Sequence, residues 1–492
     1  MRYRPSADEA KAIADTKKYN ILPLSTEIFA DIATPIEVLR ILKNVSRHCF
    51  LLESVEDMKK WGRYTFLGFE PKLELTCLDG KISLNSGTHT QSELGDPSSF
   101  IQKILDENKS PRLAYLPPFT GGLVGYFSYD FIKYAEPVLT IDAPDEEKFK
   151  DVDLMLFDKV IAFDNFTQKM ILIVNIKTDN LKTEYNRGIL ELNNLVTLLK
   201  TGSPAPNKPG KLKSDFRTLF TKDEYCAMVE QAKTYIKEGD IFQVVLSNRL
   251  EADFDGSLLD TYRVLRTINP SPYMFYLGSD DIEIAGASPE TLVKLQDQTL
   301  YTFPLAGTKP RGETQEQDLA IERGLLTDEK ELAEHNMLVD LGRNDLGRIS
   351  EFGSVKVDKY LSIERFSHVM HIGSTVESKI RSDKKAIDAI NAVLPAGTLS
   401  GAPKLRAIKI INELEQNKRG IYGGAIGYID FTGSMDTCIA IRIAYKKNKK
   451  VFVRSAAGIV ADSVPESEFN ECINKAQAVV SAIEQAEGGI DE

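Results

Sequence analysis

The sequence contains few cysteines, and they do not form the clusters that disulfide frameworks or zinc sites need. Its 492 residues include five, without a Cys-x-x-Cys pair: Cys49, Cys77, Cys226, Cys438 and Cys472. An odd number of thiols at long spacings is a poor disulfide framework and a poor zinc site. We therefore expect free thiols in a reducing cytoplasm.

The sequence also lacks long apolar runs and an excess of basic residues. Its start, MRYRPSADEAKAIADTKK, has no apolar stretch of the signal-peptide kind. No uncharged apolar run reaches the ~20 residues that a membrane-spanning helix needs. The formal net charge is −11 and no basic stripe is visible, so we expect neither a membrane nor a nucleic-acid partner. A small anionic substrate stays compatible, because a few local cations or one metal ion suffice.

The length exceeds what one ordinary core holds, and the composition is that of a globular protein, with 42% hydrophobic and 27% charged residues. The segment TGSPAPNKPGKLKS at 201–214 combines three prolines, two glycines and three lysines, which is typical of an exposed linker. It separates a strand-rich N-terminal region at 1–200 from a catalytic region at 215–492.

The local patterns favour a mixture of strands and helices. VDLMLFDKVIAFDN and KMILIVNI are apolar runs around a polar turn and predict a hairpin, and GGLVGYFSYD predicts a strand. Thr221 and Glu224 form a capping-box pattern before a helix that Gly239 suits to end. Pro465 suits the first turn of a last helix with one apolar stripe. Strands and helices that do not alternate strictly favour α+β over a doubly wound sheet.

Two segments combine residues that bind anions or metals. Pro304–Gly312, PLAGTKPRG, predicts a rigid turn that presents N–H, hydroxyl and positive charge to a carboxylate. On the segment alone, an ordinary loop is the favoured alternative. Glu331 and Glu334 stand three apart, on one side of a helix, and paired carboxylates can hold Mg²⁺. A solvated acidic face is the commoner alternative.

Other candidates depend on where the fold places them. Glu468, Glu471 and Lys475 form a stripe on the last helix that is typical of a water-facing surface, unless the stripe lines a cleft. Arg442 ends an apolar strand, where a buried guanidinium needs a carboxylate partner. His371 is more often structural than catalytic in such a setting, but an imidazole with an ordinary pKa of about 6.5 can act as a base.

These segments, taken in order, resemble the chorismate-utilising enzyme family from about Leu51 to about Val480. The series is GASPE, PLAGTKPRG, ELAEH…LVDLGRNDLGR, HVMHIGSTV, LPAGTLSGAPK, IYGGAIGY and NKAQAV. The resemblance implies an α+β (α/β mixed) fold with two stacked antiparallel-rich sheets flanked by helices in four layers. It also implies Mg²⁺ as cofactor and chorismate as substrate.

The resemblance assigns a role to particular residues. It implies that Glu334 and Glu471 bind magnesium, that His371 is the catalytic histidine, and that Glu290 protonates the departing C4 hydroxyl. The implied chorismate contacts are Gly307, Thr308, Tyr422, Arg442, Ala456, Ala457, Gly458 and Lys475. Many relatives carry a glycine where Ala456 stands.

Within the family, Ala306 and Gln243 favour the branch that forms anthranilate with ammonia. Ala306 stands where the branch that forms 4-amino-4-deoxychorismate for folate has a lysine nucleophile, which alanine cannot replace. Gln243 stands where isochorismate- and salicylate-forming relatives have a lysine that activates water. The folate branch is the nearest alternative, and a catalytically silent regulatory subunit is another.

Two further segments resemble the tryptophan feedback site of the anthranilate-forming branch. LLES and NPSPYM imply inhibitor contacts at Ser54, Pro272, Tyr273 and Met274, although NPSP is also an ordinary loop pattern. No cysteine stands in a glutaminase-type nucleophile turn, so we expect a separate glutamine amidotransferase small subunit in a hetero-oligomer. The expected activity is a magnesium-dependent lyase reaction of tryptophan biosynthesis that yields anthranilate and pyruvate.

Overall fold

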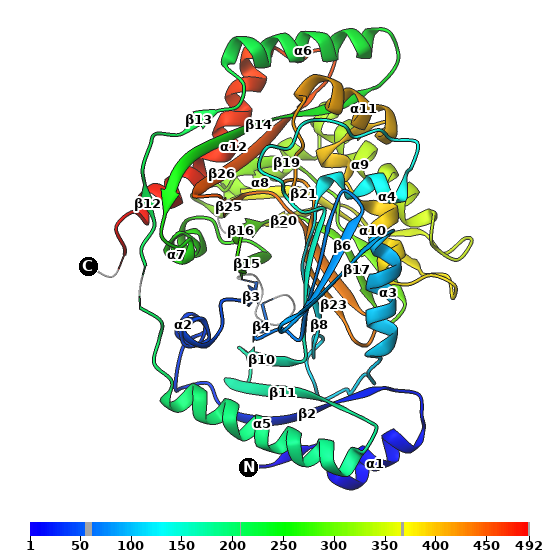
Figure 1. The fold of residues 1–492 in the computed structure, drawn as a ribbon. Helices are drawn as coiled ribbons and strands as arrows, with labels where there is room; N and C mark the ends of the chain where they lie inside the picture. Colours follow the sequence, from blue (N-terminus) through cyan, green and yellow to red (C-terminus); the bar gives the residue numbers. More distant parts are fainter. Residues whose placement is uncertain (55–61, 207, 366–368, 491–492) are drawn as a thin grey trace.

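The computed structural model describes residues 1–54, 62–206, 208–365 and 369–490. Their strands form two large antiparallel sheets, and each sheet takes strands from both sides of the 201–214 segment (Figure 1). The first sheet has the order β1 (Tyr3–Arg4), β2 (Ile21–Phe29), β11 (Lys169–Lys177), β10 (Lys159–Asp164), β4 (Tyr64–Phe69), β3 (Cys49–Glu53), β15 (Tyr273–Gly278), β16 (Glu283–Ser288), β25 (Ile443–Lys447), β26 (Lys450–Ile459), β14 (Gln243–Asp255) and β12 (Lys211–Leu212), with β13 (Arg217–Thr218) and β22 (Gly401–Ala402) also paired to β14.

The second sheet continues this interleaving, because its C-terminal strands meet N-terminal ones at the β23–β8 pair. Its order is β19 (Leu305–Pro310), β21 (Val369–Lys379), β18 (Thr299–Thr302), β17 (Thr291–Gln296), β24 (Met435–Ile439), β23 (Ala425–Asp430), β8 (Gly122–Phe127), β9 (Val152–Phe157), β5 (Leu73–Leu78), β6 (Lys81–Ser86) and β7 (His89–Leu94), with β20 (Lys356–Arg365) paired to β21. The two regions distinguished in the sequence therefore share both sheets, and their boundaries stay a prediction.

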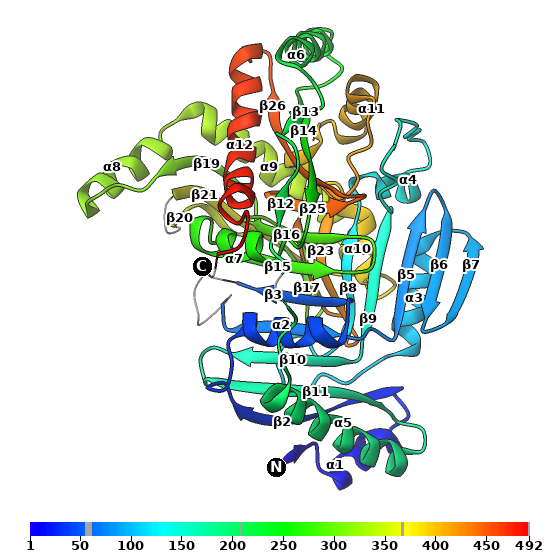
Figure 2. The ribbon, with the colours of Figure 1, turned by 60° about the vertical axis from the view of Figure 1, so that its left-hand side comes forward.

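The helices cover the outer faces of the two sheets, so the fold has the four layers expected from the sequence (Figure 2). One group of helices covers the first sheet: α1 (Ala7–Asp15), α2 (Pro35–Val45), α5 (Leu181–Thr201), α6 (Lys222–Lys237), α7 (Leu259–Ile268), α11 (Lys404–Glu415) and α12 (Pro465–Gln485). The others accompany the second sheet: α3 (Pro97–Glu107), α4 (Ile132–Ala135), α8 (Gln315–Leu325), α9 (Glu329–Gly347) and α10 (Ala386–Val393), with the short 3-10 turns η1 (Tyr129–Phe131) and η2 (Gly397–Leu399).

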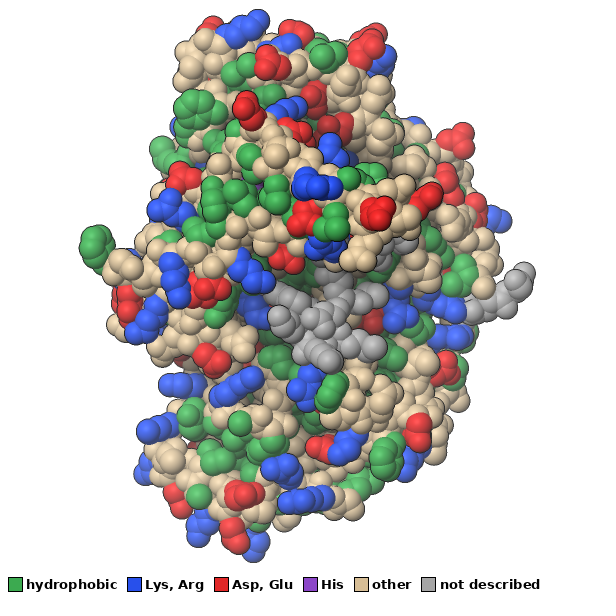
Figure 3. All heavy atoms as spheres, turned by 180° about the vertical axis from the view of Figure 1, so that it is seen from behind, with side chains coloured by type: hydrophobic (Ala, Val, Ile, Leu, Met, Phe, Trp, Pro, Cys, Tyr) green, Lys and Arg blue, Asp and Glu red, His purple; other side chains and the backbone are tan. Residues whose placement is uncertain are grey.

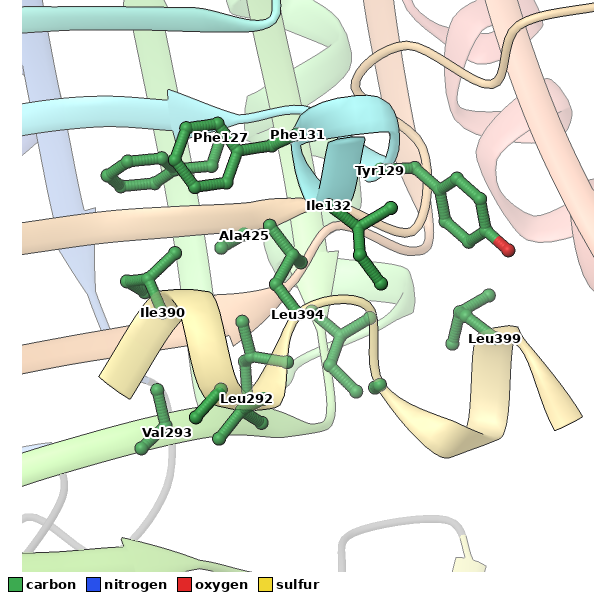
Figure 4. Close-up of a cluster of buried hydrophobic side chains, with 14 of the residues drawn as sticks. Phe127, Tyr129, Phe131, Ile132, Leu292, Val293, Ile390, Leu394, Leu399 and Ala425 are labelled. Atoms are coloured by element: carbon green, nitrogen blue, oxygen red, sulfur yellow. The ribbon is translucent and has the colours of Figure 1, made fainter. Parts of the chain in front are cut away.

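Hydrophobic side chains join the layers. Figure 4 shows part of the cluster on the second sheet, where Phe127 and Phe131 lie toward Leu292 of β17 and Leu394 beyond α10. The two rings meet edge to face with centroids 5.1 Å apart, a geometry that favours aromatic pairs. Burial of this kind drives folding. The described residues form separate hydrophobic clusters, and two of these combine side chains from both sheets.

The capping and stop patterns of two helices are confirmed. Thr221 and Glu224 satisfy each other's backbone N–H at the start of α6, and Gly239 has φ +83° just after its end. Pro465 is the first residue of α12. Polar and apolar spacing therefore located these helices correctly, since caps depend on local sequence alone.

The predicted hairpin is only half right. Strands β10 and β11 do pair, but the run VDLMLFDKVIAFDN is two strands, and β9 belongs to the second sheet whereas β10 belongs to the first. The chain crosses between sheets at Asp158, whose buried carboxylate forms an ion pair with Lys72. Alternation along a strand does not reveal which sheet the strand joins, so the crossing was missed.

The surface agrees with the charge pattern of the sequence. On the face in Figure 3, acidic and basic side chains are interspersed rather than gathered in one basic stripe. Of the helices in the described residues, none combines the length and apolar character required to cross a membrane.

Candidate active site

The structure gathers most of the predicted site residues around one cavity of about 600 Å³. Its lining comes from α9, α12, β19, β21 and the end of β26, among other segments. The predicted residues in its lining are Glu290, Gly307, Thr308, Glu334, His371, Tyr422, Arg442, Ala456, Gly458, Glu471 and Lys475. Ala457 is buried beside them and pairs with Leu246 of β14. The volume falls in the range of small-molecule sites.

Glu290 occupies the turn between β16 and β17, where the chain passes from one sheet to the other. Its carboxylate oxygen Oε1 accepts a hydrogen bond of 3.1 Å from the Thr398 hydroxyl. Burial raises the pKa of Glu290 to about 7, although Thr398, Arg442 and Lys475 act in the opposite direction. A carboxyl group with this pKa is partly protonated at neutral pH and can serve as a general acid.

His371 faces the cavity from β21 and contacts Thr308 of β19, with 3.1 Å between Nδ1 and the hydroxyl oxygen. Burial, assisted by the charge of Arg442, lowers the pKa of His371 to about 4. The imidazole is therefore neutral at physiological pH and able to accept a proton.

The predicted rigid turn around Gly307 is instead a bulged strand. The β19–β21 register breaks between Ala306 and Lys309, and Gly307 has φ +64°. A Cβ at Gly307 would come within 3.2 Å of Ile372. Pairing with β21 keeps the segment extended, while the bulge turns Thr308 toward His371.

Arg442 lies in the link between β24 and β25 with φ +51°. Burial lowers the pKa of Arg442, and Glu290 opposes this effect. Within the described ranges, no acidic group lies within 4.0 Å of its guanidinium, and its hydrogen-bond partner is Asn269 Oδ1 at 3.5 Å. A guanidinium group that lines a cavity without a close carboxylate partner is suited to bind an anionic substrate.

A group of carboxylates faces the cavity from α9 and α12: Glu331, Glu334, Glu468 and Glu471. The stripe on α12 thus lines a cleft rather than open water. Burial and repulsion from Glu331 raise the pKa of Glu334. Lys475 forms a 2.6 Å ion pair with Glu471 and also donates to the Ala456 carbonyl at 3.2 Å.

This group of carboxylates is suited to bind a divalent cation. Neighbouring negative charges in a partly desolvated wall repel, and an oxygen-seeking cation relieves that repulsion. In the described part of the chain, no three His, Cys, Asp or Glu groups form a ready metal cluster. Mg²⁺ needs no such cluster, because it binds through one or two carboxylates and keeps several waters.

Two residues of the cavity were missed in the sequence. Thr398 is 108 positions from Glu290, its hydrogen-bond partner. Arg454 lines the cavity and is fixed from behind by Glu415, with 3.0 Å between Nη2 and Oε2. The only sequence signal for Thr398 as a cavity residue was its place in the motif LPAGTLSGAPK. No local pattern indicates that residues so distant in the chain are in contact.

The Glu415 network supports the cavity wall, so Glu415→Gln is expected to destabilise the fold by about 3–5 kcal/mol. Glu415 binds both Arg419 and Arg454, and all three are almost fully buried. Burial raises the pKa of Glu415, but the two guanidinium groups outweigh it and hold that pKa low. Chemical denaturation should show the loss, whereas Glu413→Gln, an exposed change on the same helix, should leave stability unchanged.

The residues predicted to bind the inhibitor do not line this cavity. Ser54 directly follows β3, and β15, which contains Tyr273 and Met274, pairs with β3 so that Met274 faces Glu53. Pro272 precedes β15. The Tyr273 hydroxyl is 2.8 Å from both Thr291 and Asp436. The structure therefore brings the two inhibitor segments side by side.

The fold links these segments to the cavity. Strand β15 pairs with β16, placing Tyr273 opposite Ser288, two residues before Glu290. Asn269, from the same NPSPYM segment, accepts the hydrogen bond from Arg442. A movement of the NPSPYM segment and β15 can therefore be transmitted to Glu290 through β16 and to Arg442 through Asn269.

Known proteins resemble this chain over nearly all of its length. An anthranilate synthase component 1 from Acetivibrio thermocellus is 45% identical, covering 98% of this chain and 99% of that protein. Another from Aquifex aeolicus is 44% identical over 100% of both. A solved structure of anthranilate synthase component I from Streptococcus pneumoniae TIGR4 matches with TM-score 0.76 and 38% identity, covering 92% of this chain and 98% of that one.

A more distant structure shares the fold alone. The menaquinone-specific isochorismate synthase from Escherichia coli matches with TM-score 0.69 at 18% identity, covering 97% of this chain and 99% of that one. The family model described as chorismate binding enzyme matches residues 48–481, which include the whole second sheet, the first sheet apart from β1 and β2, and every residue of the cavity. The chain belongs to the chorismate-binding enzyme family.

Proposed function

We propose that this chain is the large component of an anthranilate synthase and converts chorismate and ammonia into anthranilate and pyruvate. One observation carries the proposal: a protonatable Glu290, a neutral His371 and an uncompensated Arg442 face the same cavity. This conversion needs a general acid, a general base and a group that binds the substrate carboxylates. The names of relatives at 42–45% identity support the same choice.

In the proposed reaction, Arg442 and the Gly307–Thr308 bulge hold the substrate carboxylates. Tyr422, Lys475 and the backbone at Ala456, Ala457 and Gly458 complete the binding surface. Glu290 gives its proton to the C4 hydroxyl, which leaves as water while ammonia adds at C2. His371 then removes the C2 proton as pyruvate departs and the ring becomes aromatic. Chorismate and one ammonia thus balance anthranilate, pyruvate and one water.

Glu334 and Glu471 are the residues proposed to hold Mg²⁺. When bound, the ion supplies Lewis-acid stabilisation of negative charge on the substrate. Lys475 fixes the position of the Glu471 carboxylate through their ion pair. Glu331 and Glu468 keep the surroundings rich in oxygen atoms.

The cavity wall disfavours two alternatives, the folate branch through Ala306 and the isochorismate- and salicylate-forming relatives through Gln243. Ala306 lines the cavity and has no amine with which to attack the ring. Gln243 lies against Gly458, where a Cβ would be 2.6 Å from its Nε2. A neutral amide there cannot activate water by removing a proton, whereas ammonia is already nucleophilic.

Product analysis tests the proposal. Purified chain, chorismate, Mg²⁺ and ammonium salt should yield one pyruvate per chorismate, measured by a lactate dehydrogenase coupled assay. Consumption of chorismate that requires ammonium but releases no pyruvate would assign the chain to 4-amino-4-deoxychorismate formation instead. With glutamine in place of ammonium, we expect turnover only after a glutamine amidotransferase subunit joins the complex.

Feedback by L-tryptophan is proposed at Ser54, Pro272, Tyr273 and Met274. Binding there would bias β15, which contacts the strand leading to Glu290, and couple the two sites. Ser54→Phe should raise the tryptophan concentration for half inhibition at least about tenfold, a coupling change of roughly 1.4 kcal/mol. Turnover without tryptophan should stay unchanged, and unaltered inhibition in the variant would refute this site.

A further inference from the structure

A second, smaller void lies on the other side of Glu290. Its volume is about 40 Å³, and Glu290, Leu338 and Thr398 line both this void and the substrate cavity. The general acid and its hydroxyl partner therefore form the partition between two spaces. In the proposed reaction the substrate occupies the larger of the two, the cavity of about 600 Å³.

The lining of this void favours water. Its polar members are Glu290, Thr291, Thr302, Asp345 and Thr398, and the remainder is mostly aliphatic. One water needs roughly 10–15 Å³ of such space and two or more polar partners. The void therefore has room for about two or three waters, with enough partners to hold them.

The void also reaches a buried ion pair. Asp345 of α9 lines it and accepts a 2.7 Å hydrogen bond from Lys404. The Asp345 side chain is 7% exposed and that of Lys404 is 11% exposed. Burial raises the pKa of Asp345, with Lys404 opposing. A second group able to exchange protons therefore lines the void together with Glu290.

We propose that water in this void returns a proton to Glu290 in every reaction cycle, with Thr302 and Asp345 holding the water chain. The inference rests on the proposed function. Glu290 loses its proton when the C4–O bond breaks and water leaves. The amine formed at C2 gives up one N–H proton to solvent, and the chain in the void carries one from solvent to the Glu290 carboxylate. The water chain in the void thereby restores the protonated form of Glu290 before the next turnover.

Gly342 provides a direct test, because it lines the void from within α9. A Cβ there would be 3.1 Å from Thr302 Cγ2 and 3.7 Å from Pro304, so alanine fits after a small shift and occupies the space of water. Alanine also favours the helix over glycine. Gly347 on the same helix has open space around its would-be Cβ and gives the matched control.

Gly342→Ala is expected to lower kcat about tenfold, a part of the ~10²–10⁴ that general acid catalysis contributes. Its KM for chorismate should stay unchanged, and its solvent deuterium isotope effect on kcat should increase. Thr302→Val keeps the side-chain volume but removes the hydroxyl. It should also lower kcat and increase the solvent deuterium isotope effect. Gly347→Ala should match the wild type.

Unchanged kcat in Gly342→Ala, or a lower kcat in both variants without a change in the isotope effect, would overturn the relay. The second result would mean that the methyl group merely displaces Glu290. Failure of the proposed function is distinguishable, because then the wild type and Gly347→Ala would form no anthranilate either.

Discussion

Glu290→Gln is expected to lower kcat by about 10²–10⁴, the usual contribution of a positioned general acid. Glutamine keeps the shape of the side chain and can still accept the hydrogen bond from Thr398, but it has no proton to give to the C4 hydroxyl. The KM for chorismate should change little, because Arg442 and the Gly307–Thr308 bulge remain. Initial rates of anthranilate formation measure both quantities.

The pH dependence of the wild type should report the same group. Glu290 acts in its protonated form, and its pKa of about 7 means that this form disappears as the pH rises through 7. At a fixed concentration of free ammonia, kcat/KM for chorismate should therefore fall on the alkaline side. This limb should be absent from the residual activity of Glu290→Gln.

The stability of the same variant supplies a control for folding. Folding raises the pKa of Glu290 from an ordinary 4.5 to about 7, so the folded state binds the proton more tightly. The contribution of the Glu290 side chain to wild-type stability is fully present below pH 4.5 and is lost as the pH rises through 7. At pH 8, Glu290→Gln should be more stable than the wild type by on the order of 2 kcal/mol, and at pH 4 by none. Equal kcat in both proteins would remove Glu290 from the mechanism.

Glu471→Gln and Glu334→Gln are expected to lower turnover at limiting Mg²⁺ by about 10²–10³, since metal catalysis contributes several kcal/mol. The two side chains face the cavity from α12 and α9. Each change removes one negative oxygen from the proposed cation site. Titration with Mg²⁺ in the presence of chorismate should show weaker binding, and EDTA should stop the wild-type reaction until Mg²⁺ is restored.

Glu466→Gln is the matched control for the metal site. Glu466 lies five residues before Glu471 on α12, is exposed, and pairs with Lys222 at 3.1 Å. It should leave the magnesium dependence unchanged. If Glu471→Gln behaved like Glu466→Gln, the carboxylates on α12 would have no part in metal binding.

The order of short motifs predicted much of the cavity before any coordinates. Segments as distant as Glu290 and Glu471 were assigned to one site through family resemblance, and both line the cavity. The helices α6 and α12 followed from caps and apolar spacing, which act over only a few residues. Features that depend on a few neighbouring residues can therefore be predicted from the sequence.

Features that depend on contacts between distant strands were not predictable. The crossing at Asp158 separates β9 from β10, yet both strands have the same apolar pattern. The bulge at Gly307 exists because β19 pairs with β21, over sixty residues along the chain. The Glu290–Thr398 contact and the void behind it arise from the packing of α9 and η2 against the β16–β17 turn. Sequence periodicity contains no information about such packing.

The most direct test of the central claim is to mix the wild-type chain alone with chorismate, Mg²⁺ and ammonium salt and to follow anthranilate fluorescence. We expect fluorescence that requires both Mg²⁺ and ammonium and that nearly vanishes in Glu290→Gln. Chorismate left unchanged, or consumed without fluorescence under these conditions, would contradict the account.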